Sequence, residues 1–92
     1  MKILVADAFP KDRIADLARL PRVRAVEHRP DLSAKDLPAA AREASILIVR
    51  SKQVTAEVFE ASDALSLVVR AGAGVNTIDV GAASKRGVYV AN

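Results

Sequence analysis

LSLVVRAGAGVN, residues 65–76, joins an apolar run to an arginine and a turn built from small residues. The run from Leu65 to Val69 is apolar apart from Ser66, which is typical of a strand that is buried in a sheet. Arg70 then places a guanidinium beside Ala71–Gly74, where little side-chain bulk stands between the backbone N–H groups and an approaching anion. The stretch therefore predicts a buried strand that ends in an anion-binding loop.

Four further strands are expected, separated by segments with helical spacing of their apolar residues. Proline, serine, threonine and aspartate occupy the positions where the four helices are expected to begin, and a glycine follows the end of the last helix. The expected strands are 2–6, 23–27, 45–49, 65–69 and 88–90, and the expected helices begin near Pro10, Ser33, Thr55 and Asp79. Strict alternation with short connections predicts an α/β fold. We expect a flavodoxin-like parallel five-stranded sheet, of order 2-1-3-4-5, with helices on both faces.

Composition excludes several classes of function. The 92 residues include no cysteine and one histidine, which excludes disulfides, thiolate metal sites and multi-histidine metal sites. No apolar run approaches the ~20 residues that span a bilayer, and the beginning is too soon polar for a signal peptide. A soluble, cytoplasmic protein is the expectation. The net charge is +3, but opposite charges are interspersed throughout, so neither nucleic acid nor a membrane is an expected partner.

Polar residues follow three of the expected strands. Asp7 comes after the first strand, Arg50 and Ser51 after the third, and Arg70 with its glycine loop after the fourth. Ligands of open parallel sheets bind outside the carboxyl ends of the strands, so these groups should meet. Two arginines, a hydroxyl and free N–H groups favour a carboxylate or phosphate. The alternatives are ordinary surface ion pairs for the arginines and a tight turn without a ligand for the glycines.

Other features of the sequence are weaker evidence for a functional site. Gly72-x-Gly74 begins like a dinucleotide fingerprint, but Thr77 occupies the third glycine position, so the fingerprint fails. His28 is expected at the surface, Lys52 in solvent and Asp79 as a helix cap. An arginine at the end of the third strand also excludes a phosphoacceptor receiver domain.

Two segments carry a family resemblance. Residues 50–58, RSKQVTAEV, and residues 70–79, RAGAGVNTID, are similar to motifs of the D-isomer-specific 2-hydroxyacid dehydrogenases, with residues 82–92 in register after them. Within that family the sequence most resembles the D-3-phosphoglycerate dehydrogenase branch, whose activity belongs to serine biosynthesis. The resemblance covers essentially the whole chain and implies an NAD-dependent oxidoreductase acting on a small 2-hydroxy or 2-keto acid.

The resemblance also implies which part of the enzyme this chain forms and which of its residues bind substrate. Residues 1–92 would form the N-terminal segment of the substrate-binding domain, completed by a helix from the far C-terminus of a homo-oligomeric enzyme. Its substrate-binding residues would be Arg50, Ser51, Arg70, Ala71, Gly72, Ala73 and Gly74, with Ala73 also close to the nicotinamide of NAD.

Departures and missing parts set limits on this expectation. Lys52-Gln53 and Asn76-Thr77 differ from the commoner family pattern, and His28 does not match the family's catalytic histidine. The family's catalytic arginine, glutamate and histidine and its Rossmann NAD domain lie beyond residue 92. We therefore expect no catalytic residue in this chain and no activity from it alone. The alternative is a free-standing flavodoxin-like module that binds anions or regulates a partner without catalysis.

Overall fold

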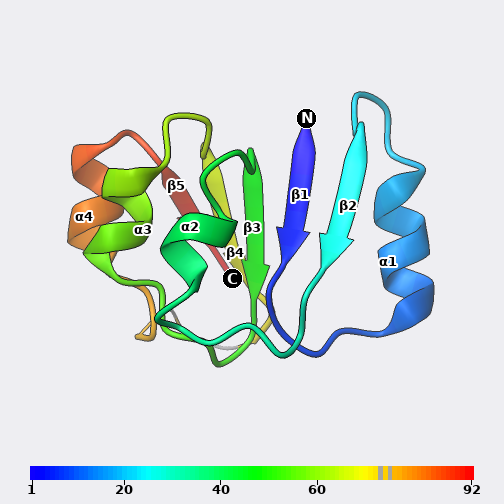
Figure 1. Cartoon of the computed structure of the whole chain (residues 1–92), viewed down its shortest axis with the longest axis horizontal. Coiled ribbons are helices and arrows are strands. Elements are labelled where there is room, and N and C mark those ends of the chain that lie inside the picture. Colours follow the sequence, from blue (N-terminus) through cyan, green and yellow to red (C-terminus); the bar gives the residue numbers. More distant parts are fainter. Residues whose placement is uncertain (73, 75) are drawn as a thin grey trace.

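The computed structural model describes residues 1–72, 74 and 76–92, and strands alternate with helices along the whole of that range (Figure 1). The strands form one sheet of order β2-β1-β3-β4-β5, and every neighbouring pair is parallel. The predicted fold is confirmed. The elements are β1 (Lys2–Val5), α1 (Lys11–Ala18), β2 (Ala25–His28), α2 (Leu37–Ala40), β3 (Ile46–Val49), α3 (Ala56–Ala61), β4 (Leu67–Arg70), α4 (Val80–Lys85) and β5 (Tyr89–Ala91).

The larger hydrophobic core lies on the sheet face covered by α2, α3 and α4 (Figure 1). Alternate strand residues point to this face because successive side chains of a strand leave opposite sides of the sheet. Leu4, Leu47 and Val68 supply the sheet side of the core and are fully buried. Phe59 of α3 is 1% exposed and is the largest of the fully buried side chains. Apolar burial on this face is the main source of the domain's stability.

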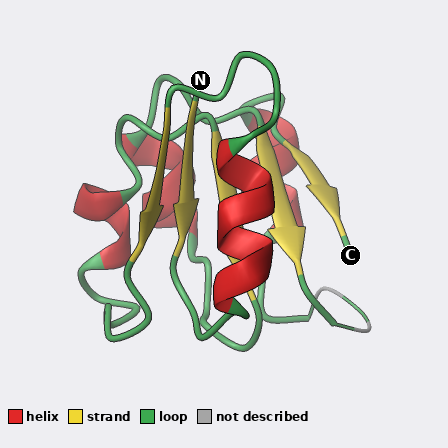
Figure 2. Cartoon of the chain, turned by 90° about the vertical axis from the view of Figure 1, so that its right-hand side faces the viewer, coloured by secondary structure: helices red, strands yellow, loops and turns green. Residues whose placement is uncertain are grey.

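The opposite face is covered incompletely. Ile3, Val5 and Ile48 form a smaller core there, against which Ile14 and Leu17 of α1 pack. Helix α1 stands beside β1 and β2, as the rotated view shows (Figure 2). The strands at the other edge receive no such cover from the described residues: Tyr89 of β5 is 79% exposed. Its register partner on β4 is Leu67, which is partly exposed on the same face.

Each predicted strand differs from the observed one by one or two residues at an end; β4, for example, begins at Leu67 and not at residue 65. The edge strand begins at Ala25, not at residue 23, and α2 spans only Leu37–Ala40. Ser33 does not cap this helix directly. Its hydroxyl accepts the backbone N–H of Asp36 at 3.3 Å and donates to the Asp36 carboxylate at 2.9 Å. This local turn competes with helical hydrogen bonding, so the helix begins only after Asp36.

The last helix behaves as predicted at both ends. The Asp79 carboxylate accepts the backbone N–H of Ala82 at 3.0 Å, which satisfies one of the unpaired donors of the first turn. Gly87 ends the turn after α4 with φ of 70°, a left-handed conformation that glycine adopts without steric cost. Thr55 occupies the position before α3, but its side chain makes no capping hydrogen bond.

Candidate functional site

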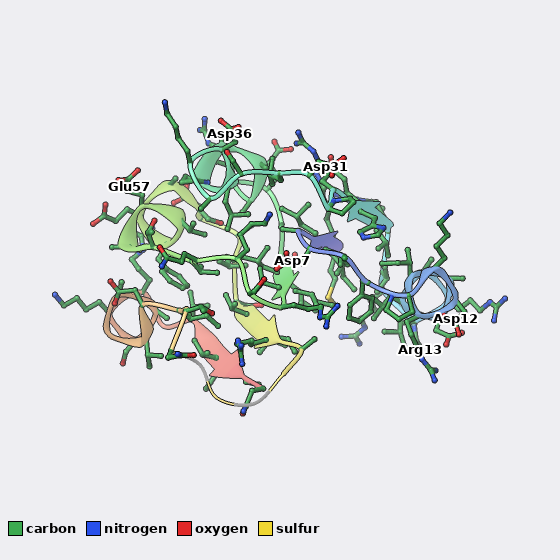
Figure 3. All side chains as sticks on the ribbon, turned by 90° about the horizontal axis from the view of Figure 1, so that it is seen from below. Asp7, Asp12, Arg13, Asp31, Asp36 and Glu57 are labelled. Atoms are coloured by element: carbon green, nitrogen blue, oxygen red, sulfur yellow. The ribbon has the colours of Figure 1, made fainter. Side chains whose placement is uncertain are left out.

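The carboxyl ends of β1, β3 and β4 enclose an open cavity of about 410 Å³. The register pairs Val49 with Arg70, and the Ala71 N–H donates to the Val49 carbonyl at 2.8 Å, so both strands end at the same level. Figure 3 views the molecule from this end, with Asp7 near the middle. The residues that line the cavity are Asp7, Ala8, Arg50, Ser51, Arg70, Ala71 and Gly72.

The structure thus brings together five of the seven residues predicted to bind substrate. Arg50, Ser51, Arg70, Ala71 and Gly72 all line the cavity. Gly74 is joined to them because Nη1 of Arg70 donates to its carbonyl at 3.2 Å. Ala73, the seventh, lies outside the described residues.

Gly72 and Gly74 both lie against the guanidinium of Arg70. A Cβ placed on Gly72 would lie 3.1 Å from Nη1 of Arg70, closer than side chains normally approach. Gly74 has φ of 79°, in the region that other L-residues adopt only with strain. Gly72 thus leaves room for the Arg70 guanidinium by its lack of a side chain, and Gly74 has a backbone conformation that favours glycine.

Asp7 contributes a group whose role the sequence pattern did not indicate. Its Oδ2 atom accepts three successive backbone N–H groups from the segment that follows β3. The donor–acceptor distances are 2.7 Å from Arg50, 3.1 Å from Ser51 and 3.0 Å from Lys52. A carboxylate that accepts several backbone N–H groups forms strong, charge-assisted hydrogen bonds. The signal in the sequence was only a carboxylate at the end of the neighbouring strand, with no indication of what it would hold.

The side chains of Lys52 and His28 also contact Asp7. The Lys52 side chain is 12% exposed, so the prediction of a solvated lysine was wrong. Its Nζ lies 3.9 Å from Oδ1 of Asp7 and donates to the carbonyl of Leu32. Nε2 of His28 lies 2.9 Å from the main-chain oxygen of Asp7, and the residue is only partly exposed. Both side chains therefore brace the chain around Asp7.

The electrostatics of Asp7 favour the ionised carboxyl. Burial by itself raises its pKa. The backbone N–H groups of Arg50 and Lys52, the positive charge of Lys52 and the N–H of Ser51 outweigh that effect, and the pKa lies below its usual value of 3.8. With Lys52 balancing Asp7, the guanidinium groups of Arg50 and Arg70 leave the cavity a positive surplus. Such a cavity can hold an anion.

The lowered pKa of Asp7 predicts a specific acid sensitivity. A group whose folded pKa is depressed adds stability above its unfolded pKa, and that stability is lost as the pH falls through the folded pKa. We expect the free energy of unfolding of the wild type to fall as the pH drops below about 3.8, the usual value for aspartate. Asp7→Asn should be less stable than the wild type at neutral pH, and the gap should narrow in acid. Urea unfolding of both proteins across this pH range measures the difference in their free energies of unfolding. A difference that stays constant with pH would contradict the prediction.

The other surfaces of the described residues are weaker candidates for a functional site. A larger cavity of about 930 Å³ is lined by charges of both signs, among them Lys2 and Glu27, which pair with each other at 3.2 Å. Within residues 1–72, 74 and 76–92 no cluster of three or more potential metal ligands exists. No helix in that part of the chain has the length and apolarity to cross a membrane. The cavity beside Arg50 and Arg70 is therefore the candidate site.

Comparison with known proteins gives one consistent family. Residues 3–92 match the model of the D-isomer specific 2-hydroxyacid dehydrogenase catalytic domain. The D-3-phosphoglycerate dehydrogenase of Methanocaldococcus jannaschii is 39% identical over 93 residues, which cover the whole of this chain. The corresponding enzyme of Mycobacterium leprae is 43% identical over 91 residues, or 98% of the chain.

Solved structures agree in fold. The NAD⁺-bound 3-phosphoglycerate dehydrogenase of Entamoeba histolytica superimposes with a TM-score of 0.84 at 25% identity. The match covers 98% of this chain and 32% of that one. The chain spans 17% of the length of the two similar enzymes from M. jannaschii and M. leprae.

Proposed function

Because the chain belongs to the D-isomer specific 2-hydroxyacid dehydrogenase family, we propose that it is the substrate-binding lobe of an NAD-dependent D-2-hydroxyacid dehydrogenase. D-3-phosphoglycerate is the proposed substrate, since similar sequences bear that activity in their names. The observation that carries the proposal is that Arg50, Ser51 and Arg70 line one cavity, together with Ala71 and Gly72. Residues 1–92 are the proposed N-terminal segment of that lobe.

The chemistry of the cavity suits an acid with a second anionic group. The planar fork of a guanidinium can donate two parallel hydrogen bonds to a carboxylate or phosphate. Arg50 and Arg70 come from neighbouring strands, so the two guanidiniums can serve different ends of a small dianion. The Ser51 hydroxyl adds a neutral donor. The N–H groups of Ala71 and Gly72, which were expected to be free, instead donate to the main-chain carbonyls of Val49 and Arg70 at 2.8 and 3.0 Å. This lobe would orient the acid and exclude water from one side of it.

The residues present do not fit the dinucleotide itself. A dinucleotide site needs a glycine-rich turn opening a helix and an acidic residue for the ribose. Here Thr77 follows Gly72-x-Gly74, and the Asp79 carboxylate is occupied as the cap of α4. NAD, when bound by the rest of the subunit, supplies the hydride acceptor. The catalytic groups are proposed to lie there too, and Ala73 is proposed to approach the nicotinamide from this lobe.

The incompletely covered sheet face supports a longer subunit. Tyr89 is 79% exposed and its register partner Leu67 is also accessible, which is unusual for a face that is otherwise apolar. We propose that another segment of the same subunit covers Leu67 and Tyr89. The chain by itself would then be a folded but inactive lobe.

Titration of the ¹⁵N-labelled chain with D-3-phosphoglycerate tests the binding proposal. Amide shifts are expected to gather in residues 50–52 and 70–74, with glycerol, which has no anionic group, as the control ligand. Shifts that gather around Lys2 and Glu27 instead, or that fail to appear at millimolar ligand, would argue against this cavity.

The catalytic half of the proposal needs a separate assay. NAD reduction with D-3-phosphoglycerate should be absent for the 92-residue chain and present for the full-length subunit. Binding by the chain without any NAD reduction by the full-length protein would favour the non-catalytic, anion-binding module instead.

A further inference from the structure

We propose that Asp7 is a positioning residue of the acid-binding site, holding the segment after β3 so that Arg50 and Ser51 face the cavity. The inference rests on the proposed function and adds a residue to it. Asp7 lies at the end of β1, and the segment it holds is 43 to 45 residues further along the chain. It acts through other residues and is not assigned a contact with the substrate.

The hydrogen bonds of Asp7 fix the backbone at three consecutive positions. One oxygen, Oδ2, accepts the N–H groups of Arg50, Ser51 and Lys52 at 2.7 to 3.1 Å. Three successive N–H groups that converge on one atom constrain the chain to a tight concave arc. The side chains at 50 and 51 are exposed on the outside of that arc and line the cavity. Without the carboxylate, three backbone donors would lose their shared acceptor.

Asp7 is itself held by two further side chains, one at its carboxylate and one at its main-chain oxygen. Lys52 approaches Oδ1 at 3.9 Å and bonds the Leu32 carbonyl, which ties the arc to the loop before α2. His28, at the end of β2, reaches the main-chain oxygen of Asp7 at 2.9 Å. The Asp7 side chain is 15% exposed, so little water competes for it. Because its surroundings fix Asp7, it can fix the arc in turn.

A positioning role and a simple charge effect predict opposite changes in the affinity for an anion when the charge of Asp7 is removed. Asp7 is negative and lines the same cavity as Arg50 and Arg70. By Coulomb's law alone, removing its charge should strengthen the binding of an anion. If Asp7 positions the binding segment, removing its charge should weaken that binding, because the arc relaxes. The two effects have opposite signs.

The test is Asp7→Asn in the full-length subunit. Asparagine has nearly the same shape, but its neutral oxygen is a weaker acceptor for three N–H groups. We expect the KM for D-3-phosphoglycerate to rise about tenfold, as follows from losing one charge-assisted interaction, while kcat and the KM for NAD change less than about threefold. Asp79→Asn is the matched control, since that carboxylate also accepts a backbone N–H but does not line the cavity. It should leave all three constants within about twofold.

The outcomes separate this inference from the proposed function. If the wild type shows no activity with D-3-phosphoglycerate, the proposed function fails. If the wild type is active and folded Asp7→Asn has an unchanged or lower KM for the acid, the positioning role is wrong.

A measurement on the wild-type chain decides the matter if Asp7→Asn does not fold. Perchlorate is the anion of a strong acid and keeps its charge throughout the acid range, so it can serve as the probe. The other charged or titratable groups around Asp7 are Arg50, Lys52 and His28, with Arg70 in the same cavity. We expect perchlorate-induced amide shifts at Arg50 and Ser51 to weaken severalfold as the Asp7 carboxyl signal titrates. Perchlorate binding that strengthens or stays constant would overturn the proposal.

Discussion

Arg50→Ala in the full-length subunit should raise the KM for D-3-phosphoglycerate by about ten- to a hundredfold. The range corresponds to about 1.5–3 kcal/mol for a hydrogen bond to a charged group. Arg50 is exposed to the cavity, and its own backbone N–H is fixed by Asp7 at 2.7 Å. Its guanidinium is therefore presented from a rigid base, and a rigid donor loses little entropy when it binds. Steady-state kinetics with varied acid and saturating NAD measure the effect.

Two variants sharpen this prediction. Arg50→Lys keeps the charge but loses the planar fork, so its KM should lie between those of the wild type and Arg50→Ala. Arg13→Ala is the control: that side chain is 67% exposed on α1, paired with Asp16 and distant from the cavity (Figure 3). If Arg13→Ala raised the KM as much as Arg50→Ala, general charge would explain the binding and a specific site at Arg50 would be wrong.

Phe59→Ala should destabilise the chain by about 3–5 kcal/mol, the usual cost of emptying a buried phenylalanine site. Phe59 is 1% exposed and sits in the larger core, where strands and helices surround it. Domains of this size are stable by only about 5–15 kcal/mol, so the variant should be largely unfolded at moderate temperature or urea concentration. Urea unfolding monitored by circular dichroism provides the measurement.

The second phenylalanine is the matched control. Phe9 is only partly buried and packs at the smaller core on the α1 side. Its replacement by alanine should cost clearly less than that of Phe59, because part of its surface already contacts water. Equal losses for the two variants would mean that the two faces of the sheet contribute equally to stability, contrary to the difference in their cover.

Much of the architecture could be predicted because local patterns encode it. Apolar runs such as residues 45–49 allow few structures other than a buried strand, and alternation with helices constrains the order of the sheet. Asp79 and Gly87 marked the ends of α4 correctly because capping depends on neighbours three or four residues away. Helix α2 was predicted too long because Ser33 and Asp36 form a turn of their own.

The candidate site could be predicted only in part. That Arg50 and Arg70 share an edge follows from strand order, which the sequence indicated. That Lys52 is only partly exposed does not follow, since its partners Asp7 and Leu32 are 45 and 20 residues away. A lysine in a polar loop is usually exposed to solvent. It is withdrawn from solvent only when the fold places a carboxylate beside it to balance its charge.

The sequence by itself therefore determined which strands are buried, how they alternate with helices, and which edge of the sheet carries the arginines. Hydrophobic periodicity and helix-capping residues depend on neighbours within a few positions, so they can be recognised from the sequence. The tertiary structure alone decided that Asp7 would bind the backbone of residues 50–52, that Lys52 would balance it, and that Leu67 and Tyr89 would remain accessible. Those contacts join residues distant in sequence, and their energies depend on distance and burial, which exist only once the sheet has formed.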